Sequence, residues 1–468
     1  MRLLLIVFAF FYCFGALSND NIFSVAASEF KTNGCSEQMN WLGSSCADAI
    51  IDRLSSDKQV RVLERENISK IIEELKLQMT ALVDEEHAVE IGRIIGADYF
   101  IFGTVSVMNE KVVISARVAN VETTEIVSTS RISGDLDNLF TLQDDLARDL
   151  SKDLSLNSVL FSDDNLDVSK ITFNVYSELN KLKELAHGLT FFHLDPARKR
   201  KKADYITGIN IADELLEIHP KLYLAYYYKS LFSLNLENFR DAEKYAELAS
   251  KLNSKDVQSN LLWAGSLMQN SKSEEAEEIL NKLTGSNQKN SIAWYGLSVL
   301  YQKMGMDYKA LECLINSLNG NSFIPKAYSN LQTLVTSTSL GNIDSYSGED
   351  YYNCVNLLNE YWSNNSKKRK DLYTLAEKVN ANFFGLFIPY FIMAQIKMES
   401  GDLQSSESLY KKSLKLCPFL PEIHREIAKV YYKTSRCKLA ENHLNIYLNN
   451  ASVVDDFEVF EKLKKKCN

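Results

Sequence analysis

The sequence has few of the residues that interrupt regular structure. Its 468 residues include only 6 prolines and 18 glycines, which argues against long flexible linkers. Beyond the N-terminus, no apolar run reaches the roughly 20 residues that a membrane-spanning helix needs. The formal net charge of −9 does not provide the basic face that phosphate binding requires. We therefore expect a chain that folds along most of its length, in two or more domains, and has no nucleic acid as partner.

Cysteines are scarce and irregularly placed. Seven of the eight follow Ser18, at wide intervals that match neither a disulfide framework nor a zinc pattern. Cys46 falls on the apolar face of an expected helix, where a small buried thiol is common. A core role is expected for Cys46, and pairing with Cys35 in an oxidising compartment stays open.

Motifs for catalysis are missing as well. The sequence has no G-x-x-x-x-G-K-[ST], no G-x-S-x-G and no H-E-x-x-H, and its six histidines are scattered. Gly92 to Gly96 ends a helix instead of opening one, so these glycines are assigned to packing and helix termination. We expect no enzymatic activity, no catalytic residue, no cofactor and no metal. An enzyme with an unrecognised site remains the alternative.

The N-terminus has the pattern of an export signal. Arg2 precedes the apolar run Leu3 to Leu17, and Ala16-Leu17-Ser18 is a small-x-small cleavage site. Residues 1–18 are therefore predicted to be a signal peptide, and the mature protein is expected in the periplasm or cell envelope, peripheral to a membrane at most. Cys13 raises a lipoprotein as an alternative, although two aromatic residues precede it where a lipobox has small ones.

The next part of the chain alternates between strand and helix patterns. Period-two stretches predict strands, and apolar residues at helical spacing predict the helices between them. The expected strands are 22–30, 60–65, 99–108, 111–121 and 125–132, and the expected helices are 37–54, one from Asn67, 85–95 and 139–154. This order predicts an α/β sandwich with helices covering a mixed sheet, in a domain of residues 19–158.

Residues 22–155 carry motifs that resemble the CsgG family, which transports curli subunits. They are the Trp41-Leu42-Gly43 segment, Val62 to Glu66, the run from Gly92 to Val105 and the hairpin Ser115 to Val127, where Thr124 replaces the usual turn glycine. The chain has no room for the extra hairpins with which the curli pore crosses a membrane. The resemblance therefore implies a relative of the non-pore envelope proteins of this fold, including flagellar lipoproteins and lipoproteins that activate penicillin-binding proteins.

The second half repeats with a period of 34 residues. Ala242, Ala276 and Ala310 keep this interval, and so do three small residues, Ser230, Ala264 and Ser298. The pattern resembles the tetratricopeptide repeat (TPR), in which small residues let the two helices of a unit touch. A second phased pair of units follows, with Ala394 and Ala428 at the same interval.

These patterns predict a TPR-type α-solenoid over residues 173–468, after a polar, acidic linker at 159–172. The fold class is therefore α/β plus all-α. The phased units are expected at about 223–256, 257–290, 291–324, 387–420 and 421–454.

Solenoids present extended concave surfaces to partners. The phase of the repeats points seven residues toward that groove, and tyrosine and arginine among them are frequent binding hot spots. The partner-binding candidates are Tyr227, Leu231, Leu261, Tyr295, Gln302, Gln395 and Arg425.

The combination predicts an exported, non-enzymatic interaction or scaffold protein of the cell envelope. Its CsgG-like domain would dock on, or oligomerise within, an envelope assembly, and its TPR array would bind a protein partner. The alternative is a ring-forming component of a secretion or surface-structure assembly machine.

Overall fold

The structure is a computed structural model that describes residues 23–35, 39–55, 60–63, 85–154, 172–187, 189, 191–192, 201–320, 324–337, 349–363, 369–418, 420–451 and 456–464. The predicted signal peptide, the helix expected from Asn67 and most of the predicted linker lie outside these residues. Within them, the fold class is as the sequence predicts: an α/β domain with a mixed sheet, followed by a TPR-type helical solenoid.

The α/β domain is built on a mixed sheet with the strand order β3-β1-β4-β5-β6, and β2 also pairs with β4. The β1, β2 and β3 pairings are parallel, whereas β4, β5 and β6 form an antiparallel meander. The strands are β1 (Phe23–Ala27), β2 (Lys31–Asn33), β3 (Val60–Val62), β4 (Tyr99–Met108), β5 (Lys111–Asn120) and β6 (Ile126–Asp135). The short β2 is not among the predicted strands.

Helices cover both faces of this sheet. The alternating residues Val112, Ile114, Ala116 and Val118 of β5 point toward helices α2 (Trp41–Leu54) and α5 (Leu139–Asp153) and are fully buried. The opposite face packs against α4 (Glu85–Ile95). A 3₁₀ turn, η2 (Leu136–Asn138), leads from β6 into α5.

The hairpin turns use residues with positive φ. Asn109 and Glu110 have φ of 52° and 62°, as the tight two-residue turn between β4 and β5 requires. Thr124, which stands where the resemblance implies a glycine, has φ of 65°. The β5–β6 hairpin is therefore present, with a β-branched residue in the left-handed region that favours glycine.

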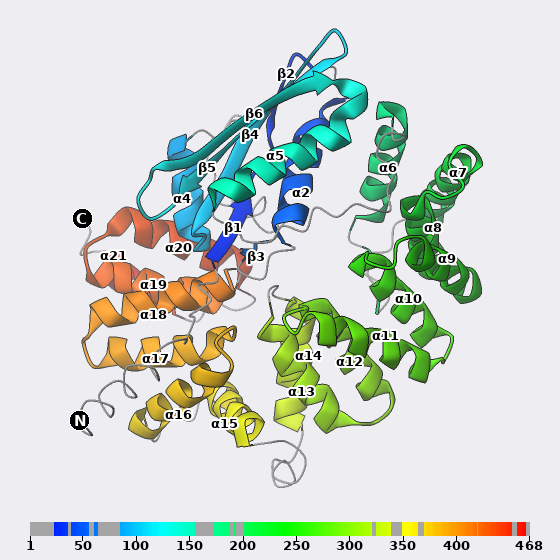
Figure 1. The fold of residues 1–468 in the computed structure, drawn as a ribbon. Helices are drawn as coiled ribbons and strands as arrows, with labels where there is room; N and C mark the ends of the chain where they lie inside the picture. Colours follow the sequence, from blue (N-terminus) through cyan, green and yellow to red (C-terminus); the bar gives the residue numbers. More distant parts are fainter. Residues whose placement is uncertain are drawn as a thin grey trace, which may run out of the picture.

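The rest of the described chain is helical (Figure 1). Its helices pack mainly on their sequence neighbours, as solenoid repeats do. They are α6 (Phe173–Ala186), α7 (Lys202–Ile218), α8 (Tyr223–Asn235), α9 (Phe239–Leu252), α10 (Val257–Gln269), α11 (Ser273–Ser286), α12 (Ser291–Lys303), α13 (Asp307–Leu318), α14 (Pro325–Ser337), α15 (Glu349–Ser363), α16 (Arg369–Asn382), α17 (Phe387–Glu399), α18 (Leu403–Leu416), α19 (Pro421–Lys433), α20 (Cys437–Asn450) and α21 (Phe457–Lys464).

The small residues of the repeat lie where two helices touch. Ala242, Ala276 and Ala310 are 0% exposed, as are their partners in the preceding helices. In the first phased unit, Ser230 Oγ donates a hydrogen bond of 2.7 Å to the carbonyl of Ala242. In a later unit Ser406 Oγ donates to the carbonyl of Ala394 over 2.9 Å. Close approach of the paired helices thus explains why only small residues occupy these positions.

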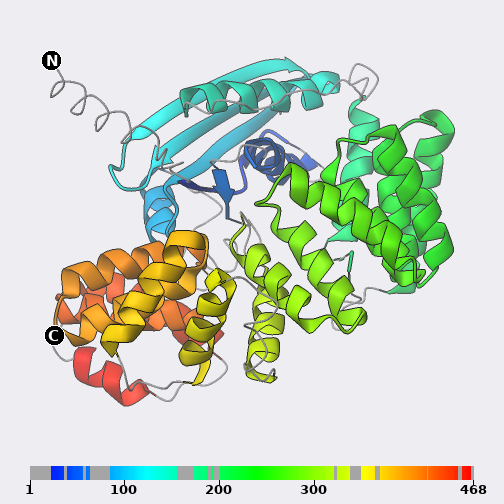
Figure 2. The ribbon, with the colours of Figure 1, turned by 60° about the horizontal axis from the view of Figure 1, so that its bottom comes forward.

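The array curves, so that α6 at its start and α18 and α20 near its end contact the α/β domain (Figures 1 and 2). At the first end, Phe173 and Tyr176 of α6 join the core formed by α2 and α5. The Tyr176 hydroxyl lies 2.7 Å from Ser45 Oγ and donates to Gln143 Oε1 over 2.9 Å.

At the other end, helices α18 to α20 lie under β3 and α4. The guanidinium of Arg61, on β3, donates to the carbonyl oxygen of Leu416 at the end of α18, and also to that of Gly320, which follows α13 in the middle of the array. Lys415 forms an ion pair with Asp98, and Ile446 of α20 enters the apolar cluster around α4. The α/β domain therefore bridges the two ends of the helical array.

The described cysteines decide whether Cys35 and Cys46 form a disulfide. Cys46 is fully buried, as expected for a core residue, and both Cys46 and Cys35 are free thiols. The pair is therefore not a disulfide. Cys437, at the start of α20, is disulfide-bonded.

Candidate partner-binding surfaces

The groove candidates are more enclosed than the repeat phase suggests. Leu231, Leu261 and Tyr295 are 3%, 0% and 4% exposed. They lie on α8, α10 and α12, the first helices of the three consecutive phased units. Tyr227 on α8 is half-buried. The expectation of an open groove is therefore wrong for Leu231, Leu261 and Tyr295, because another part of the chain covers them.

The covering segment lies between α6 and α7. Phe192, which is 3% exposed, places its ring edge-on to Tyr295, with centroids 6.3 Å apart. The ring of Phe191 is likewise edge-on to the ring of Tyr227, with centroids 6.4 Å apart. Burial raises the pKa of Tyr295 to about 12 and also raises the pKa of Tyr227. The chain itself thus occupies the groove that the sequence predicts for a partner.

Gln302 lies on the same face of α12 as Tyr295, two turns further along, and Gln395 and Arg425 lie on the later helices α17 and α19. Gln302 near the end of α12 and Gln395 on α17 are half-buried. Arg425 on α19 is part of an ionic cluster, with Nε 2.8 Å from Glu426 and 3.9 Å from Asp456. These contacts connect α19 to the segment before α21, so Arg425 has a structural role there.

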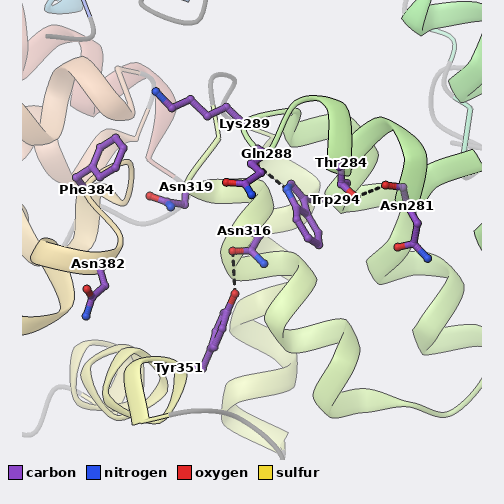
Figure 3. Close-up of a pocket in the computed structure, with 11 residues that line it drawn as sticks. Asn281, Thr284, Gln288, Lys289, Trp294, Asn316, Asn319, Tyr351, Asn382 and Phe384 are labelled. Atoms are coloured by element: carbon purple, nitrogen blue, oxygen red, sulfur yellow. Dashed lines mark hydrogen bonds between the residues drawn. The ribbon is translucent and has the colours of Figure 1, made fainter. Parts of the chain in front are cut away.

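A polar pocket opens where the phased repeats are interrupted (Figure 3). It measures about 530 Å³ and lies between α11, α12 and α13 on one side and α15, α16 and the turn after α16 on the other. Side-chain amides, three aromatic rings and one lysine dominate its lining, which consists of Asn281, Thr284, Gly285, Gln288, Lys289, Trp294, Asn316, Asn319, Tyr351, Asn382 and Phe384.

Several lining groups are fixed by hydrogen bonds. Asn316 Oδ1 accepts a bond of 3.0 Å from the Tyr351 hydroxyl, and Asn319 Oδ1 accepts one of 2.7 Å from the backbone of Gly385. Trp294 Nε1 donates to the carbonyl of Gln288 over 2.8 Å. Because the oxygens of the two asparagines serve as acceptors within the fold, their NH₂ groups are oriented as donors.

The pocket chemistry suits an uncharged or acceptor-rich ligand. None of the described residues that line it is an aspartate or glutamate, and Lys289 Nζ lies 5.5 Å above the ring of Phe384, which is 46% exposed. Amide donors and flat rings together match the carbonyl groups and side chains of a polypeptide segment. Among the described residues no group of three or more His, Cys, Asp or Glu side chains could hold a metal ion.

Sequence reasoning missed this pocket, although one signal was present. Asn281, Asn316 and Tyr351 follow one another at intervals of 35 residues, one more than the repeat period, so polar side chains recur at nearly the same place in successive helix pairs. Thr284, Gly285 and Trp294 also lie on helices of phased units, and the other lining residues come from turns and from the region where the 34-residue phase is lost. None of the described helices is both long and apolar enough to span a membrane.

Comparison with known families supports both halves of this description. Residues 12–121 match the family model of the curli production assembly/transport component CsgG. A TPR repeat-containing protein of Methanocaldococcus jannaschii, MJ1428, is 26% identical over 196 residues, which cover 40% of this chain. The chain matches only 32% of the length of that relative. The chain thus combines a CsgG-like N-terminal domain with TPR repeats.

Solved structures show similarity to each half separately. The C-terminal domain of LpoB from Escherichia coli is 17% identical and covers 26% of this chain and 89% of its own, with a TM-score of 0.21. A tetratricopeptide repeat protein from Parabacteroides merdae is 12% identical and covers 62% of this chain and 98% of its own, with a TM-score of 0.25.

Proposed function

We propose that this chain is an exported, non-enzymatic scaffold of the cell envelope, whose TPR array binds a segment of a protein partner. The polar pocket of the array carries the proposal. It combines amide donors with aromatic rings and contains no carboxylate, a composition that matches a polypeptide segment better than it matches a metal or a polyanion. The CsgG-like domain would dock on an envelope assembly.

The mode of binding follows from the lining. A peptide group offers one carbonyl acceptor and one N–H donor per residue, and side-chain amides can satisfy both. Asn316 and Asn319 line the pocket with their NH₂ groups left as donors, and Trp294 and Phe384 provide flat apolar surfaces for partner side chains. Gln302, Gln395 and Arg425 remain candidates for weaker contacts outside it.

Export rests on the N-terminal pattern and agrees with the disulfide bond of Cys437, since disulfides persist in oxidising compartments. N-terminal sequencing of the protein purified from an envelope fraction should give a start at or near Asn19. A chain that retains Met1 and fractionates with cytosolic proteins would exclude the envelope location.

The pocket can be filled without disturbing the fold. A side chain at Gly285 meets no atom within 4 Å of its Cβ, and this residue lies on the pocket wall in α11. We expect Gly285→Trp to leave the melting temperature nearly unchanged and to abolish capture of the partner in pull-downs from envelope extract.

The matched control is Glu278→Trp, which adds the same side chain at an exposed position of the same helix that does not line the pocket. It should capture the partner as well as the native chain does. Equal capture by the native chain and both variants would show that the pocket is not the partner site.

A second candidate function, a ring-forming assembly component, is favoured by β6. Within the described sheet this 10-residue strand pairs only with β5, so its outer edge can accept another strand. Negative-stain imaging and native mass spectrometry of the mature chain distinguish the two: rings of several copies support the assembly component, and monomers support the scaffold.

A further inference from the structure

Phe191 and Phe192 cover the groove and pack closely against two glycines of the helices beneath them, Gly265 and Gly296. This part of the groove is called the seat below. An added Cβ at Gly265 of α10 would lie 2.4 Å from the carbonyl oxygen of Phe191, and one at Gly296 of α12 would lie 2.6 Å from Cζ of Phe192. Both distances are too short for real atoms. Only glycine at these two positions allows Phe191 and Phe192 to approach the helices so closely.

The repeat itself does not require these glycines. One period of 34 residues before or after Gly265, the equivalent positions hold Leu231 and Val299, and the position before Gly296 holds Leu262. Glycine inside a helix is less favourable than alanine, so a glycine there needs a reason. The bound segment alone accounts for Gly265, whereas at Gly296 Phe192 is the nearest neighbour and Leu280 of α11 is the next, 3.0 Å from an added Cβ.

The walls of the seat are aromatic. Tyr227 and Tyr295 meet Phe191 and Phe192 edge-on, and the two phenylalanines are edge-on to each other, with centroids 6.1 Å apart. Trp263 of α10 belongs to the same apolar cluster as Phe191. Rings that meet edge-on attract each other beyond the burial of their area. The seat thus recognises two adjacent aromatic residues in a segment that is neither helix nor strand.

From this geometry we propose that the groove formed by α8, α10 and α12 is a peptide-binding site for segments with two adjacent aromatic residues. The chain's own Phe191-Phe192 occupies it as an internal ligand that a partner displaces. This inference rests on the proposed function, because it names a kind of segment that the array binds. It lies apart from the polar pocket, so the two sites can be tested separately.

An internal ligand competes strongly with an external one. A tethered segment has an effective concentration in the millimolar range, so a free peptide that makes the same contacts is at a disadvantage until the internal one is weakened. Removing the two rings from the chain should therefore expose the site to a peptide in solution.

The probe is a fluorescent synthetic peptide with the sequence of residues 186–195, which contains Phe191 and Phe192. By fluorescence polarisation it should bind the full-length Phe191→Ala/Phe192→Ala variant at least about tenfold more tightly than the native chain. The same peptide with both phenylalanines replaced by alanine should not bind. Adding Gly265→Leu to the double variant should abolish binding, because its side chain fills the seat.

If the double variant does not fold, Phe192→Leu keeps apolar volume in the seat but lacks the ring, and it should still bind the peptide more tightly than the native chain. A folded variant that does not bind the peptide, or that binds the alanine peptide equally well, would overturn the proposal. The readout is binding of the synthetic peptide to the groove, so Gly285→Trp, which fills the polar pocket, should leave this binding unchanged. Absence of peptide binding to the groove and absence of partner binding to the pocket are therefore told apart.

Discussion

Two buried histidines at the end of the array illustrate how neighbours fix a protonation state. His424 on α19 and His443 on α20 face each other with their Nδ1 atoms 2.8 Å apart, and both are nearly inaccessible to solvent. His424 Nε2 lies 2.6 Å from the carbonyl of Pro418, to which it can only donate. In the neutral pair, His424 Nδ1 is then the acceptor and His443 the donor.

An additional proton would break this arrangement. Burial lowers the pKa of His424 to about 4 and places that of His443 well below its usual value; the nearby His424 and Lys411 charges lower the latter further. Between about pH 6.5 and 4 the unfolded chain therefore binds protons that the folded chain does not. The contribution of the neutral pair to the free energy of unfolding is fully present above about pH 6.5 and is lost as the pH falls toward 4.

We expect the free energy of unfolding, measured by urea titration, to be lower at pH 5 than at pH 7 by about 1 kcal/mol or more from this pair. His424→Gln/His443→Gln removes both titrating groups and should show a smaller pH dependence, whatever its absolute stability. An equal pH dependence in the variant and the native chain would assign the effect to other groups.

At the scale of the helix, the repeat depends on close approach. Ala276 on α11 is 0% exposed and belongs to the continuous apolar core of the array. Ala276→Trp should separate α11 from its neighbours and destabilise the chain by about 1–3 kcal/mol or more, and the adjoining units should loosen with it. The measurement is thermal and urea unfolding.

Glu278→Trp is the control here too, since it enlarges an exposed position of the same helix and should leave the melting temperature almost unchanged. If Ala276→Trp melts like the native chain, the assignment of this alanine to the helix contact is wrong.

The elements themselves could largely be predicted from the sequence, because each leaves a local period. The alternation of Val112 to Val118 marks β5, and the alanines at 34-residue spacing mark the helix pairs. The three-residue β2 could not be predicted, since its pattern is shorter than one reliable period. The occupied groove was missed for another reason: repeat phase shows which face a residue such as Leu231 occupies, but not which distant segment covers that face.

At the scale of the whole molecule, the α/β domain holds both ends of the array. Arg61 is central to the second contact: it is 4% exposed, donates to two carbonyl oxygens of the array, and burial lowers its pKa to about 10. Arg61→Glu places a carboxylate against those carbonyls, so it should open this contact. Small-angle X-ray scattering should then show a larger radius of gyration than for the native chain.

Arg117→Glu is the matched control, because Arg117 is exposed on β5 of the same sheet. It should leave the scattering curve as it is in the native protein. If Arg61→Glu is as compact as this control, the contacts of α4 with α20 are sufficient to keep the ends together.

The bridging of the two ends has a mechanical consequence. An open solenoid behaves like a spring, because each unit leans only on its neighbours and small changes between units add up along its length. Here the first helix is attached through Tyr176, and α18 is attached through Arg61 and Lys415. Arg61 also holds the middle of the array, at the carbonyl of Gly320. Bending of the repeats therefore strains these attachments, and tension applied by a bound partner reaches the sheet of the CsgG-like domain directly.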